Sequence, residues 1–138
     1  MQNPHPDQRI ILIAERDQNV RELQRYFLGK AGYVVEFADD GQAVLDRASQ
    51  TRPALIVTEI LIQKVDGLAL CRRLREDPLT RDIPVIVFSI LAAAARAEEA
   101  GASAFLRKPL VESIFLAAIQ DAIATQPTGI REQQWASN

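Results

Sequence analysis

The sequence of 138 residues contains one cysteine, one histidine and one tryptophan. A single cysteine cannot form an intramolecular disulfide, so the disulfide-stabilised secreted scaffolds are excluded and a reducing cytoplasm is the expected compartment. Cys71 lies within a pattern of helical period, and the only histidine, His5, lies in a polar segment near the start of the chain. Because no histidine is placed to activate the thiol, a catalytic cysteine is not expected.

Long apolar runs and a strong excess of one charge are also missing. No uninterrupted apolar run approaches the length of a bilayer span, and the first eight residues lack the features of a secretory signal, so no membrane partner is expected. The formal net charge is -2. Because tracking nucleic-acid phosphates needs a basic face, and the basic cluster at 72–75 is only one helical patch, nucleic-acid binding by this domain is not expected either.

What is present is the composition of an ordinary globular domain. Hydrophobic residues make up 48% of the chain and charged residues 25%, and the length suits one domain that buries its own core. We divide the sequence into a polar leader (1–8), one folded domain (9–124) and a polar tail (125–138).

Short apolar runs alternate along the domain with segments of helical period. Strands are predicted at 10–14, 33–38, 54–58, 85–88 and 103–106. These runs are mostly unalternating, as in parallel strands that are buried on both faces. Helices are predicted after Asp17, Asp40 and Asp66, at 91–100 and at about 110–124. The alternation predicts a doubly wound α/β fold with three layers and right-handed crossovers.

The first and last predicted helices carry apolar patterns. In the first, Asp17 is placed as N-cap and Gly32 as terminator, and the apolar stripe is Val20, Leu23, Phe27 and Ala31. The last has two apolar sets, one of Val111, Phe115, Ala118 and Ala122, the other of Leu116 and Ile123. One set is expected to pack against the sheet.

Polar side chains follow four of the five predicted strands. They are Glu15, Arg16 and Asp17 after the first strand, Glu59 after the third, Ser89 after the fourth, and Lys108-Pro109 after the fifth. Ligands of doubly wound sheets bind at the carboxyl ends of the strands, so these groups are expected to converge on one pocket.

Four segments resemble, in order, the receiver domain of two-component response regulators, the CheY-like superfamily, over residues 9–124. They are ILIAERDQNVREL, PALIVTEILIQKVDGLALCRRLRED, RDIPVIVFSI and GASAFLRKPL. The resemblance implies a flavodoxin-like (βα)5 fold with strand order 2-1-3-4-5 and a role in two-component or phosphorelay signalling. In that family an aspartate ending the third strand accepts a phosphoryl group from a histidine kinase. Mg²⁺ is held there by this aspartate, an acid pair and a backbone carbonyl.

Carried over residue by residue, the resemblance places Glu59 at the phosphoacceptor position, Glu15 and Arg16 at the acid pair, and the Leu61 carbonyl at the backbone ligand. One carboxylate of the acid pair is therefore replaced by a guanidinium. Mg²⁺ prefers anionic oxygens, whereas a guanidinium offers only donors and a repelling charge. No cofactor is expected, because Mg²⁺ binding should be weak or absent.

Other family positions are retained. Ser89 keeps the hydroxyl and Lys108 the ammonium that the family uses beside the phosphoryl group, and Phe105 occupies the aromatic switch position without a phenol. The resemblance also implies a cis bond between Lys108 and Pro109. The segment from Ser89 to Gly101 is several residues shorter than usual.

The charges at the strand ends predict an ion-paired pocket. Glu15 and Glu59 balance Arg16 and Lys108, so the pocket is formally neutral without a metal. We expect Glu59 to be a permanent anion, paired with Lys108 or bidentately with Arg16. Its longer side chain is expected to reach towards Ser89.

Plainer interpretations stand beside these. Asp17 is expected to act as a helix N-cap rather than as a stand-in metal ligand, and Asp66 as the cap of the third helix. Glu15 and Arg16 could equally form a partly exposed ion pair of little energetic value. Ser89 could equally cap the fourth helix.

Three functions are therefore weighed. The leading one is a divergent receiver domain, or pseudo-receiver, that signals through protein–protein contacts without phosphorylation and is not an enzyme. The alternative is a Mg²⁺-dependent phosphorylated switch that uses Glu59 or Asp17. The third is a small flavodoxin-like enzyme, which is disfavoured because no activated nucleophile, glycine-rich phosphate loop or metal cluster is present in the sequence.

The expected partners are proteins: a sensor histidine kinase, a downstream signalling protein or a second copy of the chain. The predicted interaction face is Ala93, Ala97, Phe105, Leu116 and Ile123, unless these are scattered surface apolar residues. With no output domain after residue 124, the chain is either a single-domain regulator or a fragment of a longer one.

Overall fold

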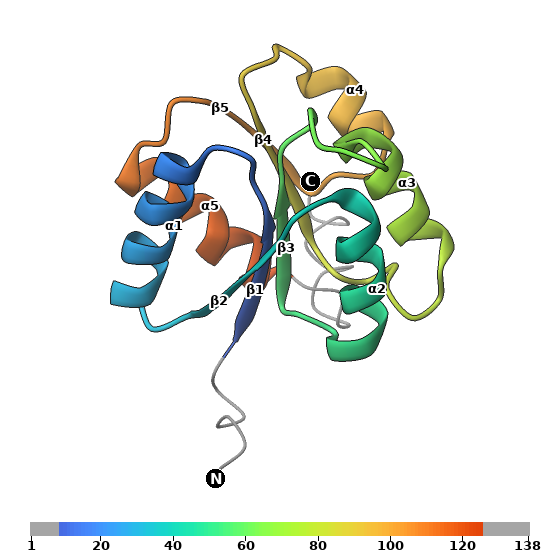
Figure 1. Cartoon of the computed structure of the whole chain (residues 1–138), viewed down its shortest axis with the longest axis horizontal. Helices are drawn as coiled ribbons and strands as arrows, with labels where there is room; N and C mark the ends of the chain where they lie inside the picture. The colour runs from blue at the N-terminus through green and yellow to red at the C-terminus, as the bar shows by residue number, and fades with distance from the viewer. Residues whose placement is uncertain (1–8, 126–138) are drawn as a thin grey trace, which may run out of the picture.

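The computed structural model describes residues 9–125, which form a parallel sheet between two layers of helices (Figure 1). The strands are β1 (Ile10–Ala14), β2 (Val34–Ala38), β3 (Leu55–Thr58), β4 (Val85–Ser89) and β5 (Ala104–Arg107). The helices are α1 (Gln18–Lys30), α2 (Gly41–Thr51), α3 (Gly67–Glu76), α4 (Ala94–Glu99) and α5 (Glu112–Ala124). The sheet order is β2-β1-β3-β4-β5 with every pair parallel, which confirms the predicted doubly wound fold.

Two segments predicted from the sequence, the leader and the tail, lie wholly or mostly outside the described residues. The leader 1–8, with His5, and residues 126–138 of the tail lie outside the described residues. Within 9–125, none of the helices has the length and apolar character needed to cross a bilayer.

The sheet separates two apolar cores. Ile11 and Ile13 of β1 face α1 and α5, whereas Leu12 and Ala14 face α2, α3 and α4. The split follows from the strand geometry, because successive side chains point to opposite faces. Figure 1 shows the same division, with α1 and α5 on one side of the sheet and α2, α3 and α4 on the other. Burial on both faces explains why these strands read as continuous apolar runs.

Aspartate caps start the first three helices where the sequence predicts them. The carboxylates of Asp17, Asp40 and Asp66 accept hydrogen bonds from backbone N–H groups of the first turns of α1, α2 and α3. The fourth helix differs from its prediction. It begins at residue 94 rather than 91, and its N-cap Ala93 makes no side-chain capping bond. Ser89 does not cap it, because its Oγ accepts from the Leu91 N–H at 3.2 Å within the preceding loop.

The inward face of α1 agrees only in part with the predicted apolar stripe, since Val20 packs against the core and Phe27 is half-buried. Leu23 is 44% exposed and Ala31 lies exposed at the C-cap, whereas Leu28 and the polar Gln24 are fully buried. Within residues 9–125, neither amide atom of Gln24 has a hydrogen-bond partner. Apolar spacing placed Leu23 rather than Gln24 on the inward face, because it assumes that a glutamine points to solvent.

The predicted interaction face also needs correction. Ala93 and Ala97 are 3% and 0% exposed and pack in the core between the sheet and α4, because positions four apart share the inward face of a helix. Phe105 is half-buried against the same core. Leu116 and Ile123 of α5 are half-buried against the opposite core.

The inward side of α5 agrees only in part with the predicted apolar set. Phe115 and Ala122 are buried as predicted, and Ile119 completes that face. Val111, by contrast, is 44% exposed because it is the N-cap that precedes the first turn. The inward face is therefore set by the middle and end of the helix.

Candidate functional site

Glu59 is held rigidly at the carboxyl end of β3. Its backbone N–H donates to the Ala14 carbonyl of the neighbouring strand at 3.0 Å, and the residue is 4% exposed. Gly67, at the start of α3, packs so closely that an added Cβ would collide with the Glu59 carbonyl oxygen. One carboxylate oxygen of Glu59, Oε1, accepts from the Ile60 N–H at 2.7 Å. The strand therefore ends on a buried anion whose backbone and side chain are both fixed.

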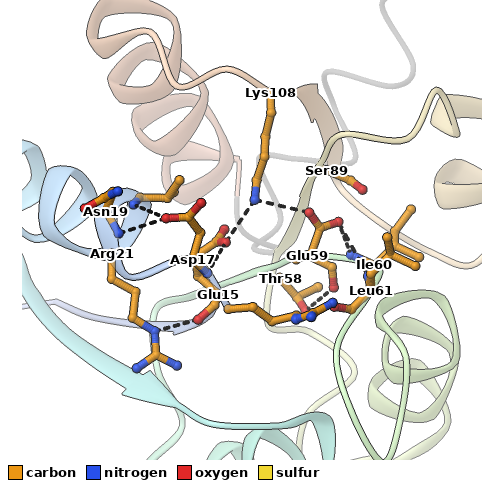
Figure 2. Close-up of polar contacts among 12 residues, drawn as sticks. Glu15, Asp17, Asn19, Arg21, Thr58, Glu59, Ile60, Leu61, Ser89 and Lys108 are labelled. Carbon is orange, nitrogen blue, oxygen red and sulfur yellow. Dashed lines mark hydrogen bonds and ion pairs between the residues drawn. The ribbon is translucent and has the colours of Figure 1, made fainter.

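Lys108 joins the ends of β1, β3 and β5. Its Nζ lies 2.9 Å from Glu15 Oε2 and 3.2 Å from Glu59 Oε2, and Figure 2 shows the ammonium between the two carboxylates. Both carboxylate side chains are nearly inaccessible to solvent, and that of Lys108 is 13% exposed. The predicted pairing of Glu59 with Lys108 is thus present, with Glu15 as a second partner.

The charge on Lys108 is stabilised by this arrangement. Burial lowers the pKa of the ammonium, but the hydrogen bonds and negative charges of Glu15 and Glu59 together outweigh burial, so the pKa of Lys108 is raised above its ordinary value. Lys108 is therefore a permanent cation at neutral pH. The Lys108-Pro109 bond that follows it is cis, as the family resemblance implied.

Glu15 is positioned by its own loop. Its Oε2 accepts from the Asp17 N–H at 3.0 Å as well as from Lys108. Its backbone carbonyl accepts from Nε of Arg21, whose guanidinium also lies 3.5 Å from Asp39 at the end of β2. Sequence reasoning missed Arg21 and Asp39. Listing the polar residue after the second strand, as was done for the other four strands, would have found Asp39, whereas Arg21 lies within α1 and follows no strand.

Arg16 does not make the predicted bidentate pair with Glu59. It is exposed, and its Nη1 donates to the Leu61 carbonyl at 3.3 Å across the mouth of the pocket. The reason is that Lys108 already occupies Glu59 Oε2 from the interior, while the arginine side chain starts from the exposed rim. Arg16 therefore ties the loop after β1 to the loop after β3.

Two other predicted residues, Asp17 and Ser89, take positions with less direct roles. Asp17 is an N-cap, with Oδ1 accepting from the Asn19 and Val20 N–H groups. Ser89 is fully buried at the end of β4, and the Glu59 side chain turns to Ile60 and Lys108 rather than to its hydroxyl. Figure 2 places Ser89 beside Glu59 with no contact drawn between them.

Around these groups lies a pocket of about 350 Å³. Its lining is Glu15, Arg16, Asp17, Glu59, Leu61, Ile90 and Lys108. The lining contains three carboxylates and two cations, so its formal charge is -1 rather than the neutral value predicted, because Asp17 also faces the pocket. Among the described residues, no group of three or more acidic, histidine or cysteine side chains is arranged to hold a metal ion.

Cys71 lies away from this pocket, in the core under α3. It is fully buried, and burial raises the pKa of its thiol to about 11. A thiol with such a pKa is protonated at neutral pH and a poor nucleophile. This agrees with the expectation that Cys71 is a structural residue.

The fold and the strand-end site are those of one family of signalling domains. The family described as "Response regulator receiver domain" matches residues 11–120, which is most of the chain. This protein therefore belongs to the response regulator receiver domain family. Receiver domains of this family are signalling proteins that interact with histidine kinases and other proteins.

Individual relatives agree with the family assignment. "Response regulator PleD" of Caulobacter vibrioides is 32% identical over 115 residues, which cover 81% of this chain and 25% of the relative. "DNA-binding dual master transcriptional regulator RpaA" of Synechocystis is 35% identical over 113 residues, which cover 80% of this chain and 47% of the relative. The chain thus spans between a quarter and about half of these curated relatives.

A solved structure supports the fold. The signal receiver domain of a signal transduction histidine kinase from Syntrophus aciditrophicus is 33% identical to this chain, with a TM-score of 0.78. The alignment covers 84% of this chain and 90% of that domain.

Proposed function

We propose that this chain is a receiver module that signals through protein contacts without phosphorylation of Glu59. The observation that carries the proposal is the Lys108 bridge. The ammonium that the family resemblance assigns to the phosphoryl group is already neutralised by Glu15 and Glu59 at 2.9 and 3.2 Å. A phosphoryl group on Glu59 would have to displace this ion pair from a nearly dry site, which is costly.

Geometry also disfavours phosphoryl transfer. A glutamate carboxylate lies about 1.5 Å further from the backbone than an aspartate carboxylate, and a misplacement of roughly 1 Å can cost about 100-fold in rate. In addition, Glu59 Oε1 is turned back to accept the Ile60 N–H. Neither oxygen of the carboxylate is presented freely to a phosphodonor.

Two further hydrogen bonds favour one fixed arrangement of the strand ends. The backbone N–H of Lys108 donates to the Ser89 carbonyl at 2.9 Å, and Arg107 Nε donates to the Ile90 carbonyl at 2.7 Å. Both bonds hold the loop after β4 against β5. We propose that the domain is held in a single state, and that protein partners recognise the surface of this state.

The proposed partners are a sensor histidine kinase or a downstream signalling protein, in the cytoplasm, with a homodimer as a further form. Phe105, Leu116 and Ile123 remain candidate contact residues because each is only half-buried. DNA binding is not carried over from the name of the transcriptional relative, because this chain spans 47% of that protein. We propose no nucleic-acid or membrane contact by this domain.

The test is intact mass after incubation with acetyl phosphate, with and without Mg²⁺. Wild type, Glu59→Ala and the double variant Arg16→Asp/Glu59→Asp are compared. Wild type and Glu59→Ala are expected to gain no phosphate, whereas the double variant recovers the carboxylates that the family uses and is the positive control. A phosphate-sized gain in wild type that disappears in Glu59→Ala would refute the proposal.

The second candidate function is a Mg²⁺-dependent phosphorylated switch. Glu59 does end β3, and Lys108 does reach it, so the position of an acceptor is retained. Asp17 is a poorer acceptor because Oδ1 already caps α1. A mass gain in wild type that requires Mg²⁺ would favour this candidate, and its loss in Asp17→Asn would identify Asp17.

A further inference from the structure

Each group that the family resemblance assigns to the metal, Glu15, Glu59 and the Leu61 carbonyl, already has at least one oxygen engaged by the protein's own donors. Glu15 Oε2 and Glu59 Oε2 share the Lys108 ammonium. Glu59 Oε1 accepts from the Ile60 N–H at 2.7 Å. The Leu61 carbonyl accepts from Arg16 at 3.3 Å. Mg²⁺ requires near-octahedral oxygen ligands, so the residues present do not fit it.

Displacing these donors would be unfavourable. Removing Lys108 from between Glu15 and Glu59 would expose the ammonium and leave the metal as the cation that neutralises two buried carboxylates. The guanidinium of Arg16 would remain at the pocket mouth and repel the incoming cation. Arginine cannot lose its charge in a protein, so no pH change removes this repulsion.

We infer that Arg16 is a built-in cation that substitutes for the divalent metal, so that Arg16 and Lys108 together assemble the strand-end pocket in the absence of Mg²⁺. Arg16 joins the loops after β1 and β3 through the Leu61 carbonyl, and Lys108 joins the ends of β1, β3 and β5. The inference deepens the proposed function, on which it rests for the role of the site.

If Arg16 takes the place of the metal, replacing Arg16 by a carboxylate should restore Mg²⁺ binding. Replacing Arg16 by aspartate removes the only donor at the Leu61 carbonyl that the described contacts include, and adds a carboxylate next to Glu15. The formal charge of the lining falls from -1 to -3. The Arg16→Asp variant is therefore expected to bind Mg²⁺ at least about tenfold more tightly than wild type.

The test is a titration of ¹⁵N-labelled protein with MgCl₂ at constant ionic strength, followed by the backbone amide resonances of Glu15, Arg16 and residues 59–62. Wild type is expected to show only small changes that are linear in MgCl₂. Arg16→Asp is expected to show saturable changes confined to these amides, and Arg16→Ala weaker ones. Arg72→Asp, a charge reversal at an exposed position of α3, is the matched control and should behave as wild type.

Saturable binding by wild type, with a midpoint within about tenfold of that of Arg16→Asp, would overturn the inference. So would a failure of both Arg16 variants to respond while their spectra remain those of a folded protein. The two hypotheses fail separately. Mg²⁺ binding by wild type without phosphate incorporation refutes only the metal substitution, whereas Mg²⁺-independent phosphorylation of Glu59 refutes only the proposed function.

Discussion

A network of contacts at each end of the sheet is centred on a cation, but the partners of the two cations differ. At the carboxyl end, Lys108 lies between the buried carboxylates of Glu15 and Glu59. At the amino end, Arg75 of α3 donates to backbone carbonyls of the loops that precede β4 and β5. Lys108 fixes the positions of two charged side chains, whereas Arg75 fixes the backbone conformation of two loops.

The amino-end cluster fixes two loops to one helix. Arg75 Nε donates to the Gly101 carbonyl at 2.8 Å, and Nη1 donates to the Arg81 and Ile83 carbonyls at 2.9 and 2.6 Å. Gly101 has φ +102, and an added Cβ would press against the Arg75 side chain. This end therefore uses the planar fork of a guanidinium for several neutral acceptors, while the carboxyl end uses the compact ammonium for two anions.

The largest expected effect is at the carboxyl end. Lys108→Met should lower the free energy of unfolding by about 3 to 5 kcal/mol, because it leaves two buried carboxylates without their cation. The measurement is urea unfolding at neutral pH. The matched control is Lys64→Met, since Lys64 pairs with Asp40 at 3.4 Å but is 66% exposed. The control should change little because solvent screens exposed pairs.

Similar losses in the two lysine variants would contradict this view of the carboxyl end. They would mean that Glu15 and Glu59 reach other donors or solvent when Lys108 is removed. A triple variant that also carries Glu15→Gln and Glu59→Gln separates the cases. It should recover part of the lost stability if uncompensated charge is the cause.

The next effect is at the amino end. Arg75→Ala should cost about 2 to 3 kcal/mol, because three carbonyl oxygens lose a charged donor while solvent can replace part of it. Hydrogen exchange should rise for amides in the loops at 81–83 and 101–103. Arg72→Ala, one turn earlier on the exposed side of α3, is the control. Equal amide hydrogen exchange in the Arg75→Ala and Arg72→Ala variants would mean that the two loops keep their conformation without Arg75.

Gln24, which lies at neither end of the sheet, is a buried polar side chain without hydrogen bonds. It is fully buried, and neither of its amide atoms has a partner among the described residues. Gln24→Met keeps the length of the side chain and removes the unsatisfied amide, so stability should rise by about 1 kcal/mol. Thermal unfolding measures the change, with the exposed Gln50→Met as control. A loss of stability would show that the Gln24 amide is hydrogen-bonded in solution.

The comparison also shows what the sequence could predict. The carboxyl-end site could be predicted because it depends on strand order: Glu15 and Lys108 are 93 positions apart and meet only because both follow parallel strands. The choice of Lys108 over Arg16 as the partner of Glu59 could not be predicted. It depends on which cation approaches from the interior, and that is set by the loop paths.

The amino-end cluster was beyond the reach of sequence patterns for a related reason. The three closest acceptors of Arg75 among the described contacts are backbone carbonyls, which every residue carries, so they leave no mark in the sequence. The burial of Gln24 was not predicted for the opposite reason, because a glutamine is expected to be exposed. Patterns of residue type therefore located the charged pairs. Contacts that depend on the conformation of a loop, or on which face a helix turns to the core, are seen only in the three-dimensional structure.

The smallest effect, and the sharpest contrast between the two ends, is expected at alkaline pH. The folded-state pKa of Lys108 is raised, so its stabilising contribution is complete below the ordinary lysine pKa of about 10.4 and is lost as pH rises through the folded-state value. The difference in unfolding free energy between wild type and Lys108→Met should be constant from neutral pH to about pH 10 and then shrink. Groups that titrate in both proteins cancel from this difference.

The corresponding difference between wild type and Arg75→Ala should stay constant over the same range, because a guanidinium remains protonated. An early decline of the Lys108 difference, below the ordinary lysine pKa, would mean that burial rather than the two carboxylates controls the charge on Lys108. The ammonium would then be a titratable group near neutrality. The carboxyl end would no longer be the permanently paired site that distinguishes it from the amino end.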